Sequence, residues 1–350
     1  MSIKDDTFCP LPWMHLGTHP HGGVTPCCIS DMTAGKNRAR DFGDDGDTFY
    51  NLNDHNISTH MNSDYFKQIR LEMLEGKEPV ACTRCYDEER KGLESKRTYE
   101  SKIYRDYDPD YATKLTGPDG SIPMDLRFVE LRLGNVCNVR CRTCNPASSS
   151  RWVADYKKIV DSLEFVNDGY SWLDHKHDFQ WPEDENFYND LFECAPNMEV
   201  LYINGGEPTL IKAHWKYLEM LVESGRSKNI ILWYNINMTS IPDKAIPLWK
   251  EFKEARVCPS IDDLAHRNTY IRFPTDWSDV ESNLKLIMDV PELTVRITQT
   301  VSAYSYIYLD EFLDWAPCPV DMNFVYDPDY LSPAILPPVV RHEAHAKFRK

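Results

Sequence analysis

Three closely spaced cysteines constrain this 350-residue chain more than any other feature. Cys137, Cys141 and Cys144 lie in the stretch CNVRCRTC, which directly follows VELRL, an apolar run with the pattern of a buried strand. Thiolates are soft ligands that suit zinc, copper(I) or iron–sulfur clusters. A closed structural zinc site needs four protein ligands, and no fourth cysteine or histidine follows on this loop. Three ligands would leave one iron of a cubane cluster open.

The other cysteines form a second group and three single positions. The N-terminal group consists of Cys9, Cys27, Cys28, Cys82 and Cys85, whereas Cys194, Cys258 and Cys318 stand alone and are expected to be small buried side chains. The N-terminal sequence, MSIKDDTFCP, lacks the basic and apolar stretches of a secretory signal, so we expect a cytoplasmic location. Disulfides are then not expected, and the clustering indicates metal or redox chemistry.

Charge and hydropathy exclude several classes of protein. The net charge of −16 disfavours binding to nucleic acid over most of the surface. A basic stretch from Arg84 to Arg105 also contains many acidic residues and is typical of a solvated face. No apolar run reaches the roughly 18 to 20 residues that a membrane span needs, so we expect no membrane segment.

The pattern of apolar residues predicts an α/β fold in the larger, C-terminal part. Helix-length stretches such as 212–225 and 280–290 separate short apolar runs, and this alternation predicts parallel strands with functional groups at their C-terminal ends. The candidate strands are residues 129–133, 199–204, 230–237, 257–262, 295–302 and 322–327.

The N-terminal part has a different character. The pattern of residues 63–76 predicts a helix that stops at Gly76. The other residues of the N-terminal part are rich in Asp, Asn, Gly and His, which indicates a loop-rich module that needs a stabilising cross-link such as a metal site. Residues 108–123 have the composition of a connection. We therefore expect two domains, 1–120 and 121–350. The chain ends in LPPVVRHEAHAKFRK, where two prolines open a helix, so a longer natural protein is one interpretation.

A C-x3-C-x2-C loop after the first strand resembles the signature of the radical S-adenosylmethionine (SAM) enzymes. The resemblance implies a partial (β/α)6 parallel barrel in which Cys137, Cys141 and Cys144 hold a 4Fe–4S cluster and SAM binds the fourth iron. One electron from that cluster would cleave SAM to methionine and a 5′-deoxyadenosyl radical, which abstracts a hydrogen atom from the substrate.

Further motifs of this family follow the later strands. The stretch GGEP matches the motif that receives the SAM amino group, with Gly205 and Gly206 allowing close backbone approach and Glu207 as an acceptor. Asn237 matches a polar contact after the third strand, and Ser260 is a candidate for the ribose hydroxyls. Thr143 departs from the pattern, which is commonly aromatic before the third cysteine, and no adenine motif is recognisable in VRITQTVS.

The N-terminal cysteines resemble those of the auxiliary-cluster domain called twitch, a shortened relative of the SPASM domain. The resemblance implies a second 4Fe–4S cluster, bound by Cys9, Cys27, Cys82 and Cys85, in a domain that precedes the barrel. The Gly-x-x-Pro-Cys match ends at Cys27, which favours Cys27 over Cys28 as the ligand. A four-thiolate zinc staple is the alternative.

The resemblance implies an oxidoreductase or maturase that oxidises or cross-links a peptide or small-molecule substrate. An auxiliary cluster would take an electron from the substrate radical, and a flavodoxin or ferredoxin would supply the first electron. A zinc-stapled scaffold and an RNA-modifying radical enzyme remain as alternatives. The sequence identifies no substrate, hydrogen donor, general base or oligomeric state.

Overall fold

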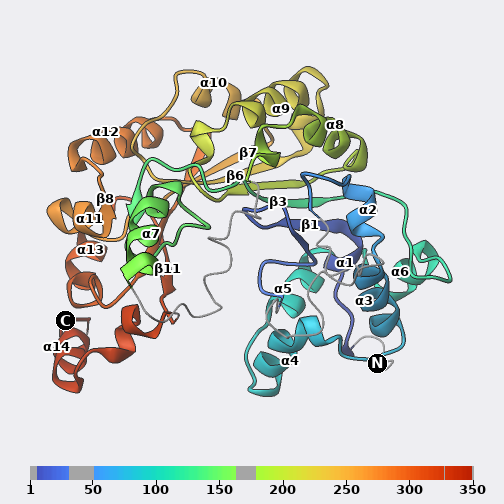
Figure 1. Cartoon of the computed structure of the whole chain (residues 1–350), viewed down its shortest axis with the longest axis horizontal. Coiled ribbons are helices and arrows are strands. Elements are labelled where there is room, and N and C mark those ends of the chain that lie inside the picture. Colours follow the sequence, from blue (N-terminus) through green and yellow to red (C-terminus); the bar gives the residue numbers. More distant parts are fainter. Residues whose placement is uncertain (1–5, 31–50, 163–178, 327, 349–350) are drawn as a thin grey trace. The chain divides into compact units, whose positions relative to one another are not determined.

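The computed structural model describes residues 6–30, 51–162, 179–326 and 328–348. It divides into two compact units (Figure 1). Unit 1 consists of Met1–Arg132 and Asp178–Tyr202, and unit 2 of Leu133–His177 and Ile203–Lys350. The three-cysteine loop therefore belongs to unit 2 and the N-terminal cysteines to unit 1.

Unit 1 combines short strands with helices. Strand β1 (His15–Thr18) pairs in parallel with β3 (Phe128–Arg132) and antiparallel with β2 (Val24–Thr25). The helices are α1 (Leu11–Met14), α2 (Ile57–Met61), α3 (Asp64–Leu74), α4 (Thr83–Arg90), α5 (Lys96–Ile103), α6 (Pro109–Leu115) and α8 (Glu185–Cys194). Strand β5 (Val200–Asn204) contains the boundary between the units.

A buried arginine joins separate segments of unit 1. Helix α3 buries Phe66, Ile69, Arg70 and Met73 at helical spacing. The Arg70 guanidinium donates to the carbonyls of Pro12 at 2.9 Å and Gly120 at 3.0 Å, and also to that of Met61. Burial lowers the pKa of Arg70 to about 9. The charge is thus tolerated because backbone carbonyls replace its hydration.

The N-terminal part is more helical than the sequence predicts. The predicted helix at 63–76 is present as α3, and Gly76 follows it with a φ of 78°. The expected connection at 108–123 instead contains α6, because Pro109 occupies its first turn and the Asp108 side chain caps the N–H of Tyr111 at 2.7 Å. The first segment of unit 1 ends at Arg132, and a domain boundary near residue 120 stays a prediction.

Unit 2 alternates strands and helices, as predicted. Strands β6 (Ile231–Ile236), β7 (Glu254–Pro259) and β9 (Leu293–Val295) are parallel, and β10 (Ile297–Val301) pairs in parallel with β11 (Val320–Phe324). The intervening helices are α9 (Lys212–Glu223), α10 (Ala245–Trp249), α11 (Ala265–Ile271), α12 (Trp277–Met288) and α13 (Leu309–Trp315). The mostly parallel α/β character is confirmed, whereas closure into a partial barrel stays a prediction.

The remaining elements of unit 2 lie next to the cysteines and at the end of the chain. Strand β4 (Arg140–Cys141) pairs antiparallel with β8 (Arg272–Phe273). Helix α7 (Val153–Ser162) follows the cysteine loop, and α14 (Pro338–Phe348) is the last described helix. The stretch 295–302 forms parts of two strands rather than one, because β9 pairs with β7 and β10 with β11.

Aromatic side chains fix the helices of unit 2 on its strands. Helices α9 and α10 lie along the same side of β6 and β7 (Figure 1). The Tyr234 ring from β6 lies 5.4 Å from the Trp249 ring of α10 and 6.4 Å from the Trp215 ring of α9, measured between centroids. All three side chains are buried. This packing orients the C-terminal ends of the strands, where the predicted site residues lie.

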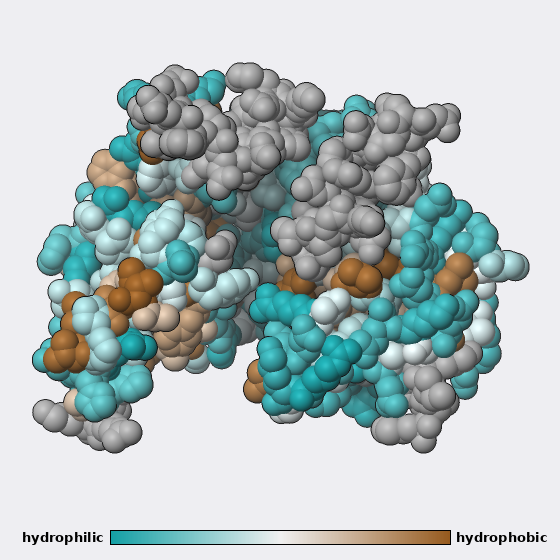
Figure 2. Space-filling model, turned by 60° about the horizontal axis from the view of Figure 1, so that its bottom comes forward, coloured by the Kyte–Doolittle hydropathy of each residue, from teal (hydrophilic) through white to brown (hydrophobic). Residues whose placement is uncertain are grey.

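The surface agrees with the charged composition. Figure 2 shows a mainly hydrophilic face on which hydrophobic side chains lie in separate patches. Within the described ranges, none of the helices has both the length and the apolar character needed to cross a membrane.

Candidate functional site

The three-cysteine loop of unit 2 is held by a short sheet and by the following helix. Cys141 in β4 lies opposite Arg272 in β8. The N–H of Cys144 donates to the carbonyl of Cys141 at 3.0 Å, and the indole N–H of Trp152 donates to the same carbonyl at 2.9 Å. Cys137 and Cys141 are buried, and Cys144 is half-buried. The structure therefore gathers the three predicted ligands in one small region.

The three thiols of this loop have different electrostatic surroundings. A hydrogen bond to Cys144 lowers the pKa of the Cys141 thiol, and the Arg272 cation lowers it further. The same hydrogen bond raises the pKa of Cys144. Burial raises the pKa of Cys137 to about 11, and the charges of Glu207 and Cys141 contribute. Among these three thiols only Cys141 has a lowered pKa, and the neighbouring Arg272 cation contributes to that shift.

Gly206 allows the loop after β5 to touch the cysteine loop. Its φ is 49°, and a Cβ at this position would lie 2.4 Å from the carbonyl oxygen of Val136. The N–H of Glu207 donates to that same oxygen at 2.8 Å. Gly205 also has a positive φ, of 79°. The predicted close backbone approach occurs here against the cysteine loop itself, and any larger residue at 206 would separate the two loops.

The Glu207 carboxylate is buried and bonded within the protein. One oxygen accepts a hydrogen bond of 2.7 Å from the Thr209 hydroxyl, and the other accepts one of 2.8 Å from the backbone N–H of Asn237. Burial raises the pKa of Glu207, while these hydrogen bonds oppose the shift. The role of Glu207 as an acceptor for the SAM amine stays a prediction, and its internal hydrogen bonds also hold the loop after β5 to the turn after β6.

Asn237 continues the network to the cysteine loop. Its side-chain amide donates to the Asn138 side-chain oxygen at 2.7 Å, and its own oxygen accepts from the Thr239 hydroxyl at 2.7 Å. Met238 adopts a φ of 62°, a conformation that favours glycine. The turn after β6 is therefore held tightly against the loop that carries Cys137 and Cys141.

Ser260 lies directly after β7, next to the same edge. Its N–H donates to the carbonyl of Ile236 at 2.8 Å, and it forms a parallel bridge to Thr298. The side chain is half-buried. The structure thus brings Glu207, Asn237 and the cysteine loop into one network and places Ser260 beside the end of β6.

The sequence analysis missed a buried ion pair next to the cysteines. The Arg272 guanidinium donates to the Asp262 carboxylate at 3.0 Å, and Asp262 also accepts from the N–H of Thr300 at 2.9 Å. Burial alone would lower the pKa of Arg272, but Cys141, Asp262 and Cys144 raise it. Asp262 lies two residues after the predicted site residue Ser260, whereas nothing in the local sequence indicates a role for Arg272.

Unit 1 gathers four cysteines from separate elements. Cys9 precedes α1, Cys27 follows β2, Cys82 precedes α4, and Cys85 lies in the first turn of α4. Burial raises the pKa of all four thiols, that of Cys27 to about 12. The charges of other members of the set raise the pKa values of Cys9, Cys27 and Cys82 further. These four thiols are therefore electrostatic neighbours.

Cys28 has different surroundings. Burial raises its pKa first, and the charge of Glu130 and a hydrogen bond with that carboxyl raise it further, whereas Lys96 and Arg132 lower it. Glu130 lies on β3 and is 3% exposed. The thiol of Cys28 thus interacts with a buried carboxyl and two cations. The pKa of Cys27 is raised by the charge of Cys28 and, to a smaller extent, by that of Cys85.

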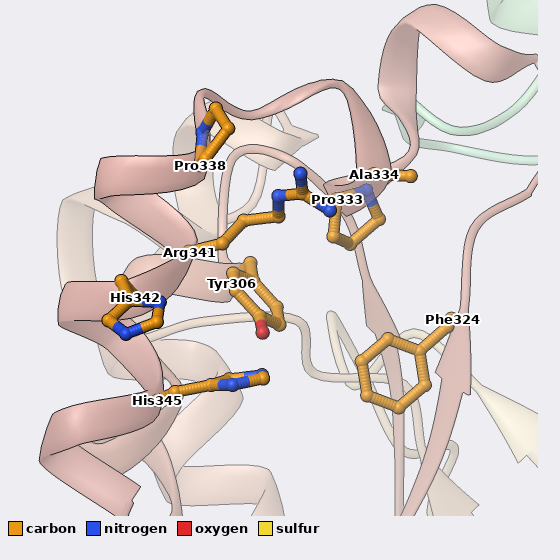
Figure 3. Close-up of a pocket in the computed structure, with 8 residues that line it drawn as sticks. All are labelled: Tyr306, Phe324, Pro333, Ala334, Pro338, Arg341, His342 and His345. Carbon is orange, nitrogen blue, oxygen red and sulfur yellow. The ribbon is translucent and has the colours of Figure 1, made fainter.

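The described residues contain no set of three or more His, Cys, Asp or Glu side chains arranged for a single metal ion. A separate open cavity of about 420 Å³ lies in unit 2, beyond the ends of β10 and β11 (Figure 3). Arg341, His342 and His345 of α14 line one side, and Phe324 of β11 faces them.

Residues 9–86 match the family model of SPASM, described as an iron–sulfur cluster-binding domain. The match begins at Cys9 and ends one residue after Cys85, so it includes the whole N-terminal group. The prediction of a SPASM-like iron–sulfur domain is thereby confirmed. No curated protein matches the chain.

Several solved structures show a weak likeness. Native anSMEcpe with bound AdoMet is 20% identical, with a TM-score of 0.37, and the match covers 56% of this chain and 50% of that one. The same protein with bound AdoMet and the Kp18Cys peptide is 19% identical, with a TM-score of 0.38, and the match covers 62% of this chain and 56% of that one. Streptococcus suis SuiB bound to S-adenosylmethionine is 13% identical, with a TM-score of 0.35, and the match covers 72% of this chain and 52% of that one. The matches span about half of each solved chain.

Proposed function

We propose that this chain is a radical SAM enzyme with two 4Fe–4S clusters. The observation that carries the proposal is the hydrogen-bond network that joins the three-cysteine loop to Glu207 and Asn237. Motifs that are separate in sequence meet at one edge of unit 2, as expected if they serve one cofactor. A chance C-x3-C-x2-C string would not require these contacts.

Cys137, Cys141 and Cys144 would hold the SAM-binding cluster. The donor set fits, because three thiols lie beside the buried cation of Arg272, which would offset the negative charge of the thiolates. Gly205, Gly206, Asn237 and Ser260 would surround SAM at the ends of β5, β6 and β7. When bound, cluster and SAM supply a 5′-deoxyadenosyl radical that removes a hydrogen atom from the substrate.

Cys9, Cys27, Cys82 and Cys85 would hold the auxiliary cluster. The match of residues 9–86 to an iron–sulfur domain favours iron over a zinc staple. Four protein thiolates leave no open iron, so this centre would receive an electron from the substrate radical rather than bind a substrate. This arrangement supports an oxidoreductase or maturase, with a flavodoxin or ferredoxin supplying the first electron.

The cavity beyond β10 and β11 would take part of the substrate. Ligands in parallel α/β proteins bind outside the carboxyl ends of strands. The cationic Arg341 and the rings of Tyr306 and Phe324 suit an acidic or aromatic group, and Figure 3 shows Arg341 and His345 extending toward this space. Such a group occurs in peptides and in small organic acids. We propose that the protein is cytoplasmic and that its substrate is a peptide or a small molecule.

Anaerobic reconstitution tests the proposal directly. We expect about eight irons and eight sulfides per chain, and 5′-deoxyadenosine when SAM and dithionite are added. The triple variant C137A/C141A/C144A should retain about four irons and form no 5′-deoxyadenosine. The variant C194A, which changes a cysteine outside both groups, should behave as the wild type.

Two results would overturn the proposal. Zinc without iron after reconstitution would support a zinc-stapled scaffold. Cleavage of SAM by the triple variant would show that another centre performs the chemistry. An RNA-modifying enzyme has no support from the charge of the chain.

A further inference from the structure

A buried arginine of unit 1 contacts the neighbours of two predicted ligands of the auxiliary cluster. Arg97 is the second residue of α5 and is 7% exposed. Its guanidinium donates to the backbone carbonyl of Phe8, the residue before Cys9, at 2.9 Å. The same guanidinium lies 5.3 Å from the centre of the ring of Tyr86, the residue after Cys85. Arg97 therefore lies between two segments that each carry a predicted ligand.

The carboxylate of Glu89 holds this guanidinium in place. Glu89 lies on α4, one helical turn after Cys85. Both of its oxygens accept hydrogen bonds from Arg97, one of them from Nε at 3.0 Å. The Ser95 hydroxyl, which also caps α5, donates to the same carboxylate. Two carboxylate oxygens and the carbonyl of Phe8 thus fix the position of the Arg97 charge.

Arg97 acts on three of the four predicted ligands. Burial raises the pKa values of the Cys9 and Cys82 thiols, and the charge of Arg97 opposes that shift. Burial also raises the pKa of Cys85, whereas hydrogen bonds with the backbone N–H of Arg97 and with the Ser95 side chain oppose it. The arginine therefore favours negative charge on these sulfur atoms.

Stability alone does not explain this ion pair. Apolar side chains of similar volume often stabilise a protein as well as a buried ion pair does. The guanidinium is largely buried, and Glu89 offsets part of its charge. A cation and an anion that are both fixed beside the cysteines form a pair of opposite charges whose effects on a bound cluster should have opposite signs.

We propose that Arg97 raises the reduction potential of the auxiliary cluster and that Glu89 limits this increase. The inference rests on the proposed function, which assigns a 4Fe–4S cluster to the cysteines of unit 1. Reduction adds one electron and one negative charge to the cluster, and no bond forms or breaks. The potential of such a cluster depends on nearby charge and on hydrogen bonds to its sulfur atoms. A higher potential favours acceptance of the electron that the proposed function directs to this centre.

Two variants that change the charge in opposite directions test the proposal. R97Q removes the cation, whereas E89Q removes the anion that offsets it. Both are made in the C137A/C141A/C144A background, in which the auxiliary cluster is the centre expected to remain. R97K keeps the charge, and R90Q removes an arginine of α4 that forms exposed ion pairs with Glu78 and Asp87. After anaerobic reconstitution, iron and sulfide are counted, and redox titration followed by electron paramagnetic resonance gives the midpoint potential.

The expected shifts differ in sign. At the midpoint potential of the background protein, R97Q should contain about tenfold less reduced than oxidised cluster, which corresponds to a potential about 59 mV lower for one electron. At the same potential, E89Q should contain about threefold more reduced than oxidised cluster, because the cation is no longer offset. R97K should stay within about twofold of the background protein, and R90Q should match it.

Iron content separates a change in potential from a failure to fold. Unchanged potentials in R97Q and E89Q at full iron content would overturn the proposal, and so would shifts of both variants in the same direction. If R97Q loses its iron, E89Q decides the question, because a lower or unchanged potential in that variant would overturn the proposal. Zinc without iron in the background protein would instead refute the proposed function.

Discussion

The Glu207 carboxylate accepts a hydrogen bond of 2.8 Å from the backbone N–H of Asn237. This contact joins the loop after β5 to the turn after β6, and the second oxygen of Glu207 accepts from the Thr209 hydroxyl. The carboxylate is 1% exposed. A buried acceptor between two backbone turns fixes their separation, because leaving either donor unpaired costs about 1–3 kcal/mol.

Glu207→Gln should therefore weaken SAM binding without loss of iron. The amide keeps one acceptor but presents an N–H₂ group to the second donor, so the loop of Gly205 and Gly206 shifts. We expect a dissociation constant for SAM about tenfold higher, which corresponds to about 1.4 kcal/mol. Equilibrium titration of the reconstituted protein measures it, with Glu219→Gln on the exposed face of α9 as control. Unchanged SAM affinity, or loss of the cluster, would contradict the positioning role.

Cys27 and Cys28 should differ in iron content. The charges of both Cys28 and Cys85 act on Cys27, whereas the Cys28 thiol has a hydrogen bond with the Glu130 carboxyl. In the C137A/C141A/C144A background, Cys27→Ala should reduce iron from about four per chain to near zero, and Cys28→Ala should leave about four. Iron and sulfide analysis after anaerobic reconstitution gives the answer. The reverse result would make Cys28 the ligand.

The sequence predicts the elements of this fold better than the contacts between them. Strands β6 and β7 and helix α9 appear near their expected ranges, because strand and helix periodicities are local properties. Helices α4, α5 and α6 were missed, because each has eight residues or fewer and thus only a short apolar stripe. The side chains of Ser95 and Asp108 cap α5 and α6.

In the candidate site too, the sequence predicts the motifs better than the contacts between them. The cysteine loop and the GGEP stretch are visible as motifs, but the partner of Glu207 is a backbone N–H, which any residue at position 237 except proline would supply. Arg272 reaches the thiols only because β4 pairs with β8, two strands far apart in the chain. Neither relationship has a sequence signal.

Arg272 should set the reduction potential of the SAM-binding cluster. Its buried cation lies beside Cys141 and Cys144 and is held by Asp262. Reduction adds negative charge, which a neighbouring cation stabilises, so Arg272→Gln should lower the midpoint potential by about 60 mV. Redox titration followed by electron paramagnetic resonance measures this value.

Two further variants separate charge from folding. Removing Arg272 alone leaves Asp262 buried without its cation, which costs about 3–5 kcal/mol, so R272Q/D262N provides a neutral pair. Arg272→Lys keeps the charge and should retain most of the wild-type potential. An equal decrease in potential for R272K and R272Q would show that shape, not charge, matters.

Acidification should destabilise unit 2 through His214. This imidazole is fully buried between the carbonyl of Ile211 at 2.6 Å and the Tyr234 hydroxyl at 2.9 Å. Burial lowers its pKa from 6.5 to about 3. Below about pH 6.5 the imidazole is protonated in the unfolded chain, whereas in the folded chain it stays neutral down to about pH 3. The contribution of His214 to the free energy of unfolding is therefore fully present above pH 6.5 and decreases as the pH falls from 6.5 to 3.

The variant His214→Gln removes this titration. Between pH 7 and pH 5, the wild type should lose about 2 kcal/mol of unfolding free energy through His214. The variant is expected to be less stable at pH 7, because it loses the imidazole contacts, but its decrease over the same pH interval should be about 2 kcal/mol smaller. Urea unfolding followed by the fluorescence of Trp215 and Trp249 reports on this region, with the exposed His266→Gln as control. An identical pH dependence for H214Q and the wild type would mean that other groups govern acid unfolding.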